Sequence, residues 1–514
     1  MTSIRSAHAG SSGRLGRALW RNRCIYLMIL PVVAYFLVFR YWPMSWLAVA
    51  FYDFKMLKGF SGSRFVGFEN FIEFFGGMNF WRTIGNTVIL NFYSLLFVFP
   101  APVIFSLMLN EVARPGLKRT IQTISYLPYF ISTVVLVGMI ISFLSPSSGV
   151  LGAAIRWLGG EAPYLLGDPR YFRGINVVSG IWQTTGWNAV VYLSALTTID
   201  PQLYEAAFMD GAGRMRRIWH ISLPGIKNTV VILFVLRIGD LLGANMEKVL
   251  LLQNDLNLSI SVSEETAIMR GEVTFYPKGF SFASYGRVLQ AKSILRAYGN
   301  TIFTTVCGCV VSLLLTSLAA YPLAFAEFHG KKLYNLMIVI TLWFSGGIVP
   351  SFLVMSSLGL TDTLWALIAA NAVSAFNVLV LRSFFASMPY SLIESAKMDG
   401  ANDFYSLFRI VLPLAKASLA TIGLWVVVGH WKDYLGPLIY LRTYTKYTLQ
   451  LVLRDMVMTA ETSSLFEIME GNRTAIPEQL KHAVIVVAML PVLAVYPFVQ
   501  KYFVKGVMLG AVKG

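Results

Sequence analysis

The chain has 514 residues, of which 56% are hydrophobic and only 13% are charged, and its mean hydropathy is +0.63. Soluble globular proteins carry about 25% charged residues, so this composition excludes an ordinary soluble domain and indicates a membrane protein. The formal net charge of +16 does not indicate nucleic-acid binding, because the basic residues flank apolar runs, as membrane orientation requires, and the chain has no nucleic-acid-binding motif.

The chain begins with a basic, Ser/Gly-rich stretch, "SIRSAHAGSSGRLGRALWRNR", and has no acidic residue before Asp53. The apolar run after Cys24 lacks a small-residue cleavage site. We therefore interpret the stretch as a cytoplasmic tail that leads into a first anchor helix, and not as a cleaved signal. Cys307 and Cys309 also lie in an apolar run, and the three cysteines lack the spacing of a disulfide framework or a zinc site.

Apolar runs of about 20 residues can cross the hydrocarbon core as helices that satisfy their own backbone hydrogen bonds. We therefore expect an all-α polytopic membrane protein with about ten transmembrane helices. The expected spans begin near Cys24, Ile84, Ile121, Arg173, Gly225, Gly299, Tyr334, Leu364, Leu414 and His482.

Short basic loops predict the orientation of these spans. The loop after the second span carries Arg114, Lys118 and Arg119, and the loop after the sixth carries Lys331 and Lys332. With the basic N-terminal tail inside, these loops and both termini are cytoplasmic. The longer connections then lie outside, at 52–81, 146–172, 246–298 and 442–481.

A short polar segment occurs twice, each time between two apolar runs. The first copy, from Tyr204, is "YEAAFMDGAGRMRRIWHISLPGI", and the second, from Ile393, is "IESAKMDGANDFYSLFRIVLPLA". The copies align without a gap at a constant offset of 189 residues, from Glu205 to Glu394. Four expected spans separate them, so both copies face the cytoplasm and the chain consists of two halves with the same topology, a parallel repeat.

Each copy is predicted to form two short helices joined at a glycine. Pro201 suits the first turn of a helix, and the small residues after Glu205 let another surface approach closely. Gly211 supplies the turn, because glycine adopts a positive φ at little cost. Pro224 is expected to open the next span. A single copy could be a surface helix that merely orients the chain, but the duplication favours a binding role.

The repeated segment resembles the E-A-A, then Gly, then I-x-L-P signature of permease subunits of type I ATP-binding-cassette (ABC) importers. Two further stretches, "GHWKDYLGPLIYL" and "QKYFVKGVMLGAVKG", resemble the carbohydrate-uptake, maltose-type branch of that family. The resemblance covers nearly the whole chain, and each half is similar to one partner of an oligosaccharide- or polysaccharide-type heterodimer. It implies two ABC type-1 transmembrane domains and solute import across the plasma membrane of a bacterium.

In the family, this cytoplasmic loop forms a coupling helix that is seated in a cleft of the ATP-binding subunit. The resemblance therefore implies two copies of a separate ATPase subunit, which uses the ATP, and an extracellular solute-binding (lipo)protein as partners, besides membrane lipid. The chain itself has no G-x-x-x-x-G-K-[ST] loop for ATP phosphates, so we expect it to bind no cofactor. The matching coupling positions are Glu205, Ala206, Ala207, Asp210, Gly211 and Pro224 in the first copy and Glu394, Ala396, Asp399, Gly400 and Pro413 in the second, where Ser395 replaces the first Ala of the signature.

Family partners usually have six spans each, so ten spans imply that two helices are missing at the junction of the halves. The predicted organisation is a cytoplasmic basic tail (1–23), a first permease half (24–253, with its transmembrane domain at about 82–250, lacking the last helix), an extracellular junction (254–298), a second half (299–500, lacking the usual preceding first helix) and a cytoplasmic tail (501–514).

The remaining polar residues predict no enzyme, because no catalytic arrangement can be argued from their spacing, and the five histidines lack the spacing of metal ligands. Arg237 and Asp240 lie three residues apart in the fifth span, on one helix face. Intramembrane charges of this kind either form a structural ion pair or serve as a contact to sugar hydroxyls or as a gate. Lys432 and Asp433, near the end of the ninth span, leave the same alternatives. The sequence identifies no substrate-binding residue.

Two classes of function remain. In the first, the chain is the permease of an ATP-driven oligosaccharide importer, with both halves of a heterodimer fused. In the second, it is an ion-coupled secondary transporter with two parallel repeats. The duplicated coupling segment favours the first. A fused permease that inserts without transporting is a third alternative, and neither its activity nor the identity of the sugar can be read from the sequence.

Overall fold

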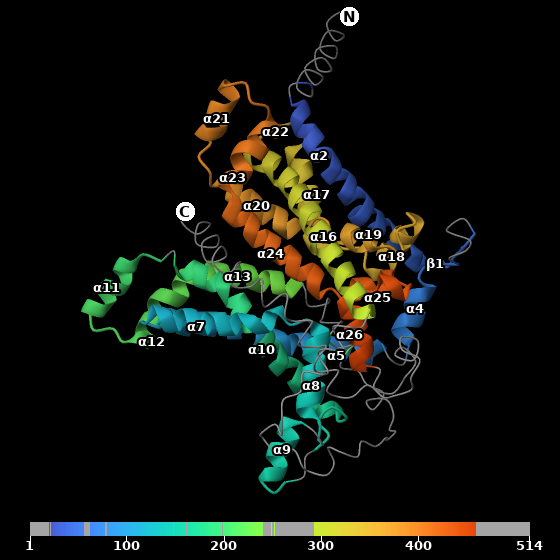
Figure 1. Ribbon diagram of the computed structural model, residues 1–514, viewed down its shortest axis with the longest axis vertical. Coiled ribbons are helices and arrows are strands. Elements are labelled where there is room, and N and C mark those ends of the chain that lie inside the picture. The colour runs from blue at the N-terminus through green and yellow to red at the C-terminus, as the bar shows by residue number, and fades with distance from the viewer. Residues whose placement is uncertain are drawn as a thin grey trace, which may run out of the picture.

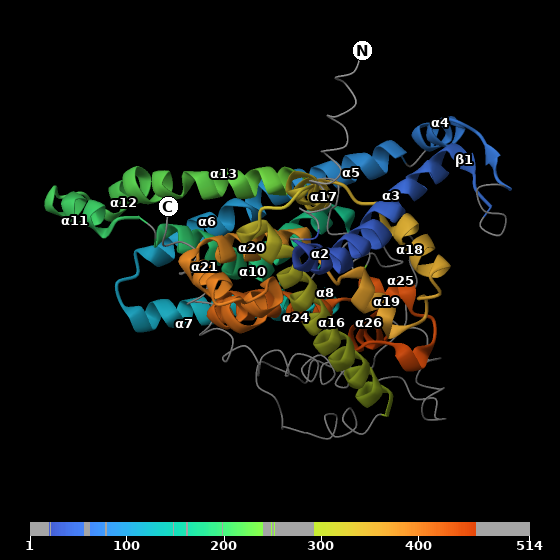
Figure 2. The same ribbon diagram turned by 90° about the horizontal axis from the view of Figure 1, so that it is seen from above.

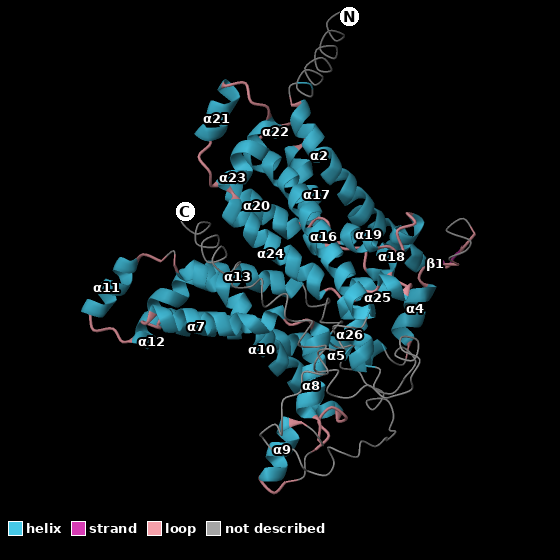
Figure 3. Cartoon of the chain, viewed as in Figure 1, coloured by secondary structure: helices cyan, strands magenta, loops and turns pink. Residues whose placement is uncertain are grey.

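Helices make up almost all of the regular structure. The computed structural model describes residues 20, 22–55, 62–77, 80–146, 149–160, 163–197, 199–239, 248, 251 and 292–458. Within these ranges the only strands are β1 (Tyr52–Asp53) and β2 (Arg64–Phe65), which pair antiparallel (Figure 3). This agrees with the expected all-α class. Most of the N-terminal tail and of the junction, the span near His482 and the C-terminal tail lie outside the described residues.

The helices of the first half come first along the chain. They are α2 (Arg23–Phe36), η1 (Leu37–Tyr41), α3 (Trp42–Ser45), η2 (Trp46–Phe51), α4 (Glu69–Gly76), α5 (Phe80–Tyr93), η3 (Ser94–Val98), α6 (Pro100–Asn110), α7 (Pro115–Tyr126), η4 (Leu127–Phe130), α8 (Thr133–Leu144), α9 (Val150–Trp157), α10 (Pro169–Leu196), α11 (Pro201–Met209), α12 (Arg214–Arg217), η5 (Ile218–Ser222) and α13 (Leu223–Gly239).

The helices of the second half follow. They are α16 (Lys292–Phe325), α17 (Lys331–Trp343), α18 (Ile348–Ser357), α19 (Leu364–Ala370), α20 (Ala375–Ala386), α21 (Ser391–Met398), α22 (Asp403–Tyr405), η9 (Ser406–Val411), α23 (Leu412–Leu414), α24 (Lys416–Lys432), α25 (Leu435–Tyr440), η10 (Tyr444–Lys446) and α26 (Leu449–Met458).

Four helices among the described residues are long and apolar enough to cross a membrane: Arg23–Phe51, Phe80–Asn110, Arg214–Val235 and Lys292–Phe325. Three bent pairs raise the number to seven: Pro115–Phe130 with Thr133–Leu144, Leu364–Ala370 with Ala375–Ala386, and Asp403–Leu414 with Lys416–Lys432. Each of the seven overlaps an expected span, and the starts expected near Arg173 and Tyr334 fall in α10 and α17. The total of ten stays a prediction.

Four prolines each follow a π-helical turn. The turn makes room for the proline ring, which also leaves the carbonyl four residues back without an N–H to accept. The turns η1, η3, η5 and η9 end two residues before Pro43, Pro100, Pro224 and Pro413. In each turn the residue before the proline donates its amide five residues back, as Phe99 does to the Ser94 carbonyl at 3.0 Å. In a regular α-helix the proline ring would clash with the carbonyl four residues back, and the wider π turn gives that carbonyl room.

Helix α2 belongs to the first half in sequence but packs on the second half in space (Figure 1). Its buried residues lie in one hydrophobic cluster with α16, α17 and α20. Two hydroxyl groups fix its register, since Tyr26 donates to the His329 carbonyl (3.1 Å) and Tyr41 donates to the Met337 carbonyl (2.9 Å). The first helix among the described residues therefore crosses to the opposite half.

The two halves also meet where η4 and α10 face α24. Tyr129 and Trp187 stack with their ring centroids 4.5 Å apart, and the Lys432 ammonium lies 3.9 Å from the centroid of the Tyr129 ring. The same ammonium donates to the Tyr129 carbonyl (3.0 Å). Asp433 accepts the Gly436 amide at 2.9 Å. The Lys432 side chain thus contacts the facing half of the chain, and the Asp433 side chain binds its own loop.

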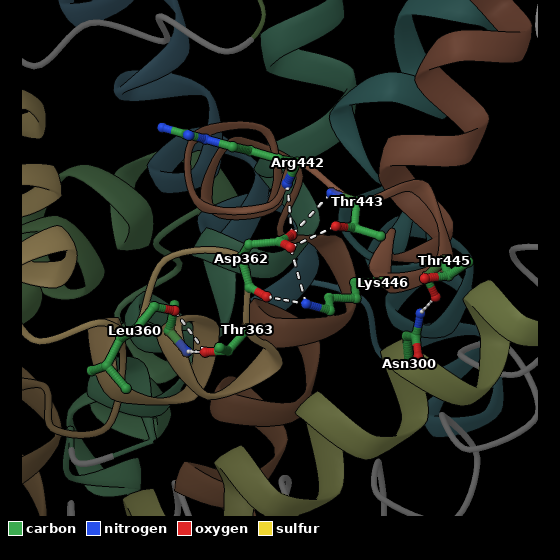
Figure 4. Close-up of polar contacts among 9 residues, drawn as sticks. Asn300, Leu360, Asp362, Thr363, Arg442, Thr443, Thr445 and Lys446 are labelled. Atoms are coloured by element: carbon green, nitrogen blue, oxygen red, sulfur yellow. Dashed lines mark hydrogen bonds and ion pairs between the residues drawn. The ribbon is translucent and has the colours of Figure 1, made fainter.

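A polar clasp, formed by Asp362 with residues 442–446, joins two loops of the second half (Figure 4). Asp362 has a positive φ of 56°. Its carboxylate accepts the amides of Arg442 and Thr443 (2.9 Å each) and the Thr443 hydroxyl (2.6 Å), and Lys446 Nζ lies 3.0 Å away. These contacts, the Thr443 hydroxyl foremost, hold the pKa of the Asp362 carboxyl well below its usual range. The clasp fixes the chain after α25 to the loop before α19.

The substitution Asp362→Asn should weaken the clasp, because asparagine tolerates the same backbone conformation but carries no charge. We expect the free energy of unfolding at pH 7 to fall by about 1 kcal/mol. Folding lowers this pKa, so the stabilisation by the carboxylate is present above the unfolded pKa, near about 4, and is lost as the pH falls through the folded value. Thermal melting of both proteins in detergent at about pH 7 and pH 3 should show a smaller difference at the lower pH. A difference independent of pH would contradict this role.

Candidate functional site

The first repeated segment folds as two short helices joined by a glycine turn. Helix α11 has Pro201 in its first turn and is capped by the carboxylate of Asp200. Gly211 has a φ of 73°, and the Ala212 amide closes the turn by donating to the Ala207 carbonyl at 2.8 Å. The turn therefore forms as the Asp-Gly-Ala sequence predicts, with the glycine in the conformation that other residues avoid.

The second segment repeats this turn at the same offset of 189 residues. Gly400 has a φ of 82°, and the Ala401 amide donates to the Ala396 carbonyl at 2.9 Å. The capping differs, because α21 begins at Ser391 without a proline and the side chain of Asn402 caps α22. Two sequences that share few residues outside the signature thus form the same backbone turn.

The two segments join their following spans differently. We expected Pro224 to open a new helix, but α12, η5 and α13 form one continuous helix from Arg214 to Val235, and the π turn accommodates the proline. In the second copy, the helix that contains Pro413 bends by 85° against α24. The first repeated segment is therefore continuous with its span, whereas the second meets its span at an angle.

Both segments present acidic and apolar side chains at equivalent positions. Met209 and Met398, at the ends of α11 and α21, are 84% and 85% exposed, and each of the pairs Leu203 with Leu392 and Trp219 with Phe408 is exposed in both copies. Of the expected coupling residues, Glu205, Ala206, Asp210, Gly211, Pro224, Glu394, Asp399, Gly400 and Pro413 are exposed, Ala207 is half-buried and Ala396 is buried. The two segments therefore expose similar apolar side chains at equivalent positions.

Each segment is also tied to the C-terminal end of a long helix. In the first half, the Arg217 guanidinium lies 3.1 Å from Glu111 Oε2, directly after α6. In the second half, the Tyr321 hydroxyl near the end of α16 donates to Asp403 Oδ1 (3.3 Å), which also lies 3.5 Å from Lys397 Nζ. Each segment is therefore in direct contact with a helix of its own half.

The helices that the two segments contact occupy equivalent positions in the two halves. A second repeated motif, which sequence reasoning missed, shows this. R-x-x-G-N-T occurs in both α5 and α16, at an offset of 214 residues (from 82 to 296). Its asparagine anchors each helix, because Asn86 Oδ1 accepts from Arg173 (3.2 Å) and the Asn300 amide donates to the Thr445 carbonyl (3.0 Å). The motif could have been found, but its offset differs from 189 because the intervening connections differ in length.

Two views of the molecule place the segments on one side. Helices α11 and α21 both project at the left, whereas α4, β1, α18 and α25 gather at the right (Figure 1, Figure 2). The coupling segments and the Asp362 clasp are thus separated by the length of the long helices. Within the described residues, no group of three His, Cys, Asp or Glu side chains could hold a metal ion.

A cavity of about 350 Å³ lies among η3, α6, α10 and α13 of the first half. Two cations line it. Arg237 donates to the Ser94 hydroxyl (2.9 Å), and the Lys248 ammonium donates to the Asn176 carbonyl (3.0 Å). Sequence reasoning singled out Arg237 but missed the cavity, because α10 and α13 are brought together only by the fold. The expected partner of Arg237, Asp240, lies outside the described residues.

Comparison with known proteins gives two matches to one family, described as "Binding-protein-dependent transport system inner membrane component", at residues 98–320 and 309–509. Protein LplB of Bacillus subtilis (strain 168) is 42% identical over 257 residues, which are 50% of this chain and 81% of that protein. The polygalacturonan/rhamnogalacturonan transport system permease protein YtcP of the same organism is 43% identical over 239 residues, 46% of this chain and 84% of that protein. One solved structure is similar, the crystal structure of a bacterial ABC transporter involved in the import of the acidic polysaccharide alginate. One of its chains is 40% identical and superposes with a TM-score of 0.45, and the match covers 48% of this chain and 82% of that chain.

The glycine turn can be tested by a matched pair of substitutions. Gly211→Ala places alanine at a φ of 73°, which costs about 1 kcal/mol. Gly213→Ala is the control, because the backbone φ there is −66°, which alanine adopts without strain. An added Cβ meets no atom within 4 Å at either site. We expect Gly211→Ala to speed amide hydrogen exchange at Ala212 roughly fivefold, with no change in the control. Equal protection in both variants would show that the turn does not depend on the left-handed glycine.

Proposed function

Because the chain belongs to the family of binding-protein-dependent transport system inner membrane components and carries that domain twice, we propose that it supplies both halves of the membrane pathway of one ABC importer. It is a membrane-embedded transport permease, as its relatives are. The duplicated segment carries the proposal, since its backbone turn and its exposed methionines recur at one offset. An ion-coupled carrier has no use for two such segments, and we set that alternative aside.

Two copies of an ATP-binding subunit dock on the two segments, one on each. Glu205 and Glu394 present the charge, and Met209 and Met398 supply exposed apolar contact, the mixture that protein interfaces use. The contacts of Arg217 and of Asp403 with the helix ends carry movement of the ATPase into the membrane helices. ATP is bound and used by that separate subunit.

The solute is an oligosaccharide that an extracellular binding protein delivers. Relatives named for a solute include permeases for polygalacturonan/rhamnogalacturonan, for arabinooligosaccharides and for diacetylchitobiose. The family description itself includes dependence on a binding protein. The membrane is the plasma membrane of a bacterium, with both termini and both docking segments in the cytoplasm.

The chain has ten spans, and the junction at 254–298 lacks the two helices that a pair of six-span partners would contribute. The lost final helix of the first half belongs to the core of the pathway, so its absence exposes small or polar helix faces to lipid. Transport is therefore weaker than in a chain that restores both helices.

The docking role predicts that reversing the charge on both segments releases the ATPase. The double substitution Glu205→Lys with Glu394→Lys should reduce copurification of the ATP-binding subunit at least about tenfold, since each lost charge-assisted contact is worth about tenfold. Glu73→Lys, on the exposed face of α4, is the control and should change nothing. If the double variant keeps both its ATPase and its sugar-stimulated ATP hydrolysis, the segments do not couple.

The orientation predicts which sites a membrane-impermeant thiol reagent reaches in intact cells. In a background without the three native cysteines, Glu73→Cys should be labelled from outside, and Gly213→Cys should be labelled only after the cells are broken. Both positions are exposed, so burial does not explain a difference between them. Labelling of Gly213→Cys in intact cells would reverse the orientation.

A further inference from the structure

The cavity of the first half lies at mid-depth in the bundle. Its lining residues on α10 run from Asn176 to Tyr192, in a helix of 28 residues that begins at Pro169. At 1.5 Å per residue this stretch occupies the middle of a helix about 42 Å long. Transporters hold their solutes near the bilayer midplane, and cavities of roughly 300–1,000 Å³ are the usual size for small-molecule sites.

The charges in the cavity are of one sign. Arg237 and Lys248 both line it, and none of the lining residues that the structure describes is acidic. Among the described residues, the hydrogen-bond partners of the two cations are neutral oxygen atoms, the Ser94 hydroxyl and the Asn176 carbonyl. Charges at membrane depth are costly and are retained where they pair with an opposite charge or mark a solute pathway.

A buried polar atom with no partner also faces this site. Asn176 lines the cavity and is only 7% exposed, yet its side-chain Oδ1 has no hydrogen-bond partner among the described residues. Lys248, beside it, is 5% exposed. An unsatisfied buried acceptor costs about 1–3 kcal/mol, so a hydrogen-bond donor placed in the cavity would be stabilised by this oxygen. A ligand that brings a hydroxyl donor would satisfy the Asn176 oxygen.

We propose that this cavity binds a uronate residue of an acidic oligosaccharide, with its carboxylate held by Arg237 and Lys248 and a ring hydroxyl donating to Asn176. The guanidinium suits a carboxylate because it presents two parallel N–H groups to the two oxygens. Further neutral polar groups for the sugar hydroxyls are supplied by Gln183, Thr184 and Asn188, all on α10. This inference rests on the proposed import of oligosaccharides and narrows the solute to sugars that carry a carboxylate.

A charged solute and its neutral analogue separate this proposal from a general sugar site. Trigalacturonate and its fully methyl-esterified form share the ring hydroxyls and differ in charge. Isothermal titration of the purified full chain in neutral detergent, without ATPase, should show the acid binding at least about tenfold more tightly than the ester. Comparable affinity within about twofold, or no binding of the acid, would overturn the proposal.

The substitutions Arg237→Gln and Lys248→Gln should each weaken binding of the acid roughly tenfold or more and weaken binding of the ester much less, because the ester carries no charge, so that the acid-to-ester ratio falls. Lys227→Gln, an exposed cation of α13 outside the cavity, is the matched control and should behave as the unaltered chain does. If Arg237→Gln lowers the melting temperature while the acid-to-ester ratio persists in both cavity variants, Arg237 is a structural partner of Asp240 and the proposal fails.

A lipid competition and a second variant distinguish the remaining explanations. Phosphatidylglycerol added to the detergent should not displace the acid, and displacement at equal concentration would assign the cations to a lipid headgroup and overturn the sugar assignment. If Arg237→Gln does not fold, Lys248→Gln and the acid-to-ester ratio of the unaltered chain decide. Failure of ATPase docking would appear as lost copurification and leave this binding ratio unaffected.

Discussion

Backbone hydrogen bonding in hydrocarbon is the constraint on which the rest of this structure depends. No water is present there to satisfy an amide or a carbonyl, so each spanning segment must satisfy its own. Prolines break that rule locally, and four of them are preceded by a π turn that moves the clashing carbonyl aside. Two of these turns, η5 and η9, lie within the repeated segments, just before the following spans. In the first segment the helix continues unbroken through Pro224 into its span, whereas in the second the helix that contains Pro413 bends by 85° against α24.

The parts of the structure that the sequence predicted well are those set by local chemistry. The Asp-Gly-Ala turn forms in both copies because only glycine enters the left-handed region cheaply, and Gly211 and Gly400 both do so. The spans among the described residues overlap helices because a run of about 20 apolar residues has few other folds available in lipid. The family resemblance was carried by the same local signature and is confirmed by two matches along the chain.

The parts that could not be predicted depend on contacts between distant segments. Nothing in the sequence of α2 and η1 indicates that Tyr26 and Tyr41 will donate to carbonyls of the other half. The Asp362 clasp joins residues about 80 positions apart, and a lone aspartate in a polar loop gives no sign of it. The cavity is of the same kind, since Arg237 could be singled out as an intramembrane charge but its neighbours on α10 could not. The sequence predicts that Arg237 pairs with Asp240, because the two lie three residues apart on one helix face, and this pairing stays a prediction.

The crossing of α2 to the opposite half has a consequence for how the chain is made. It is made before α16 and α17, on which it packs, and these follow roughly 300 residues later. At about 5–20 residues per second, α2 precedes these helices by on the order of ten seconds or more. The hydrogen bonds that Tyr26 and Tyr41 donate to the second half can therefore form only after that half has been made. A chain interrupted after its first half would leave this helix inserted in the membrane but without the surface it binds.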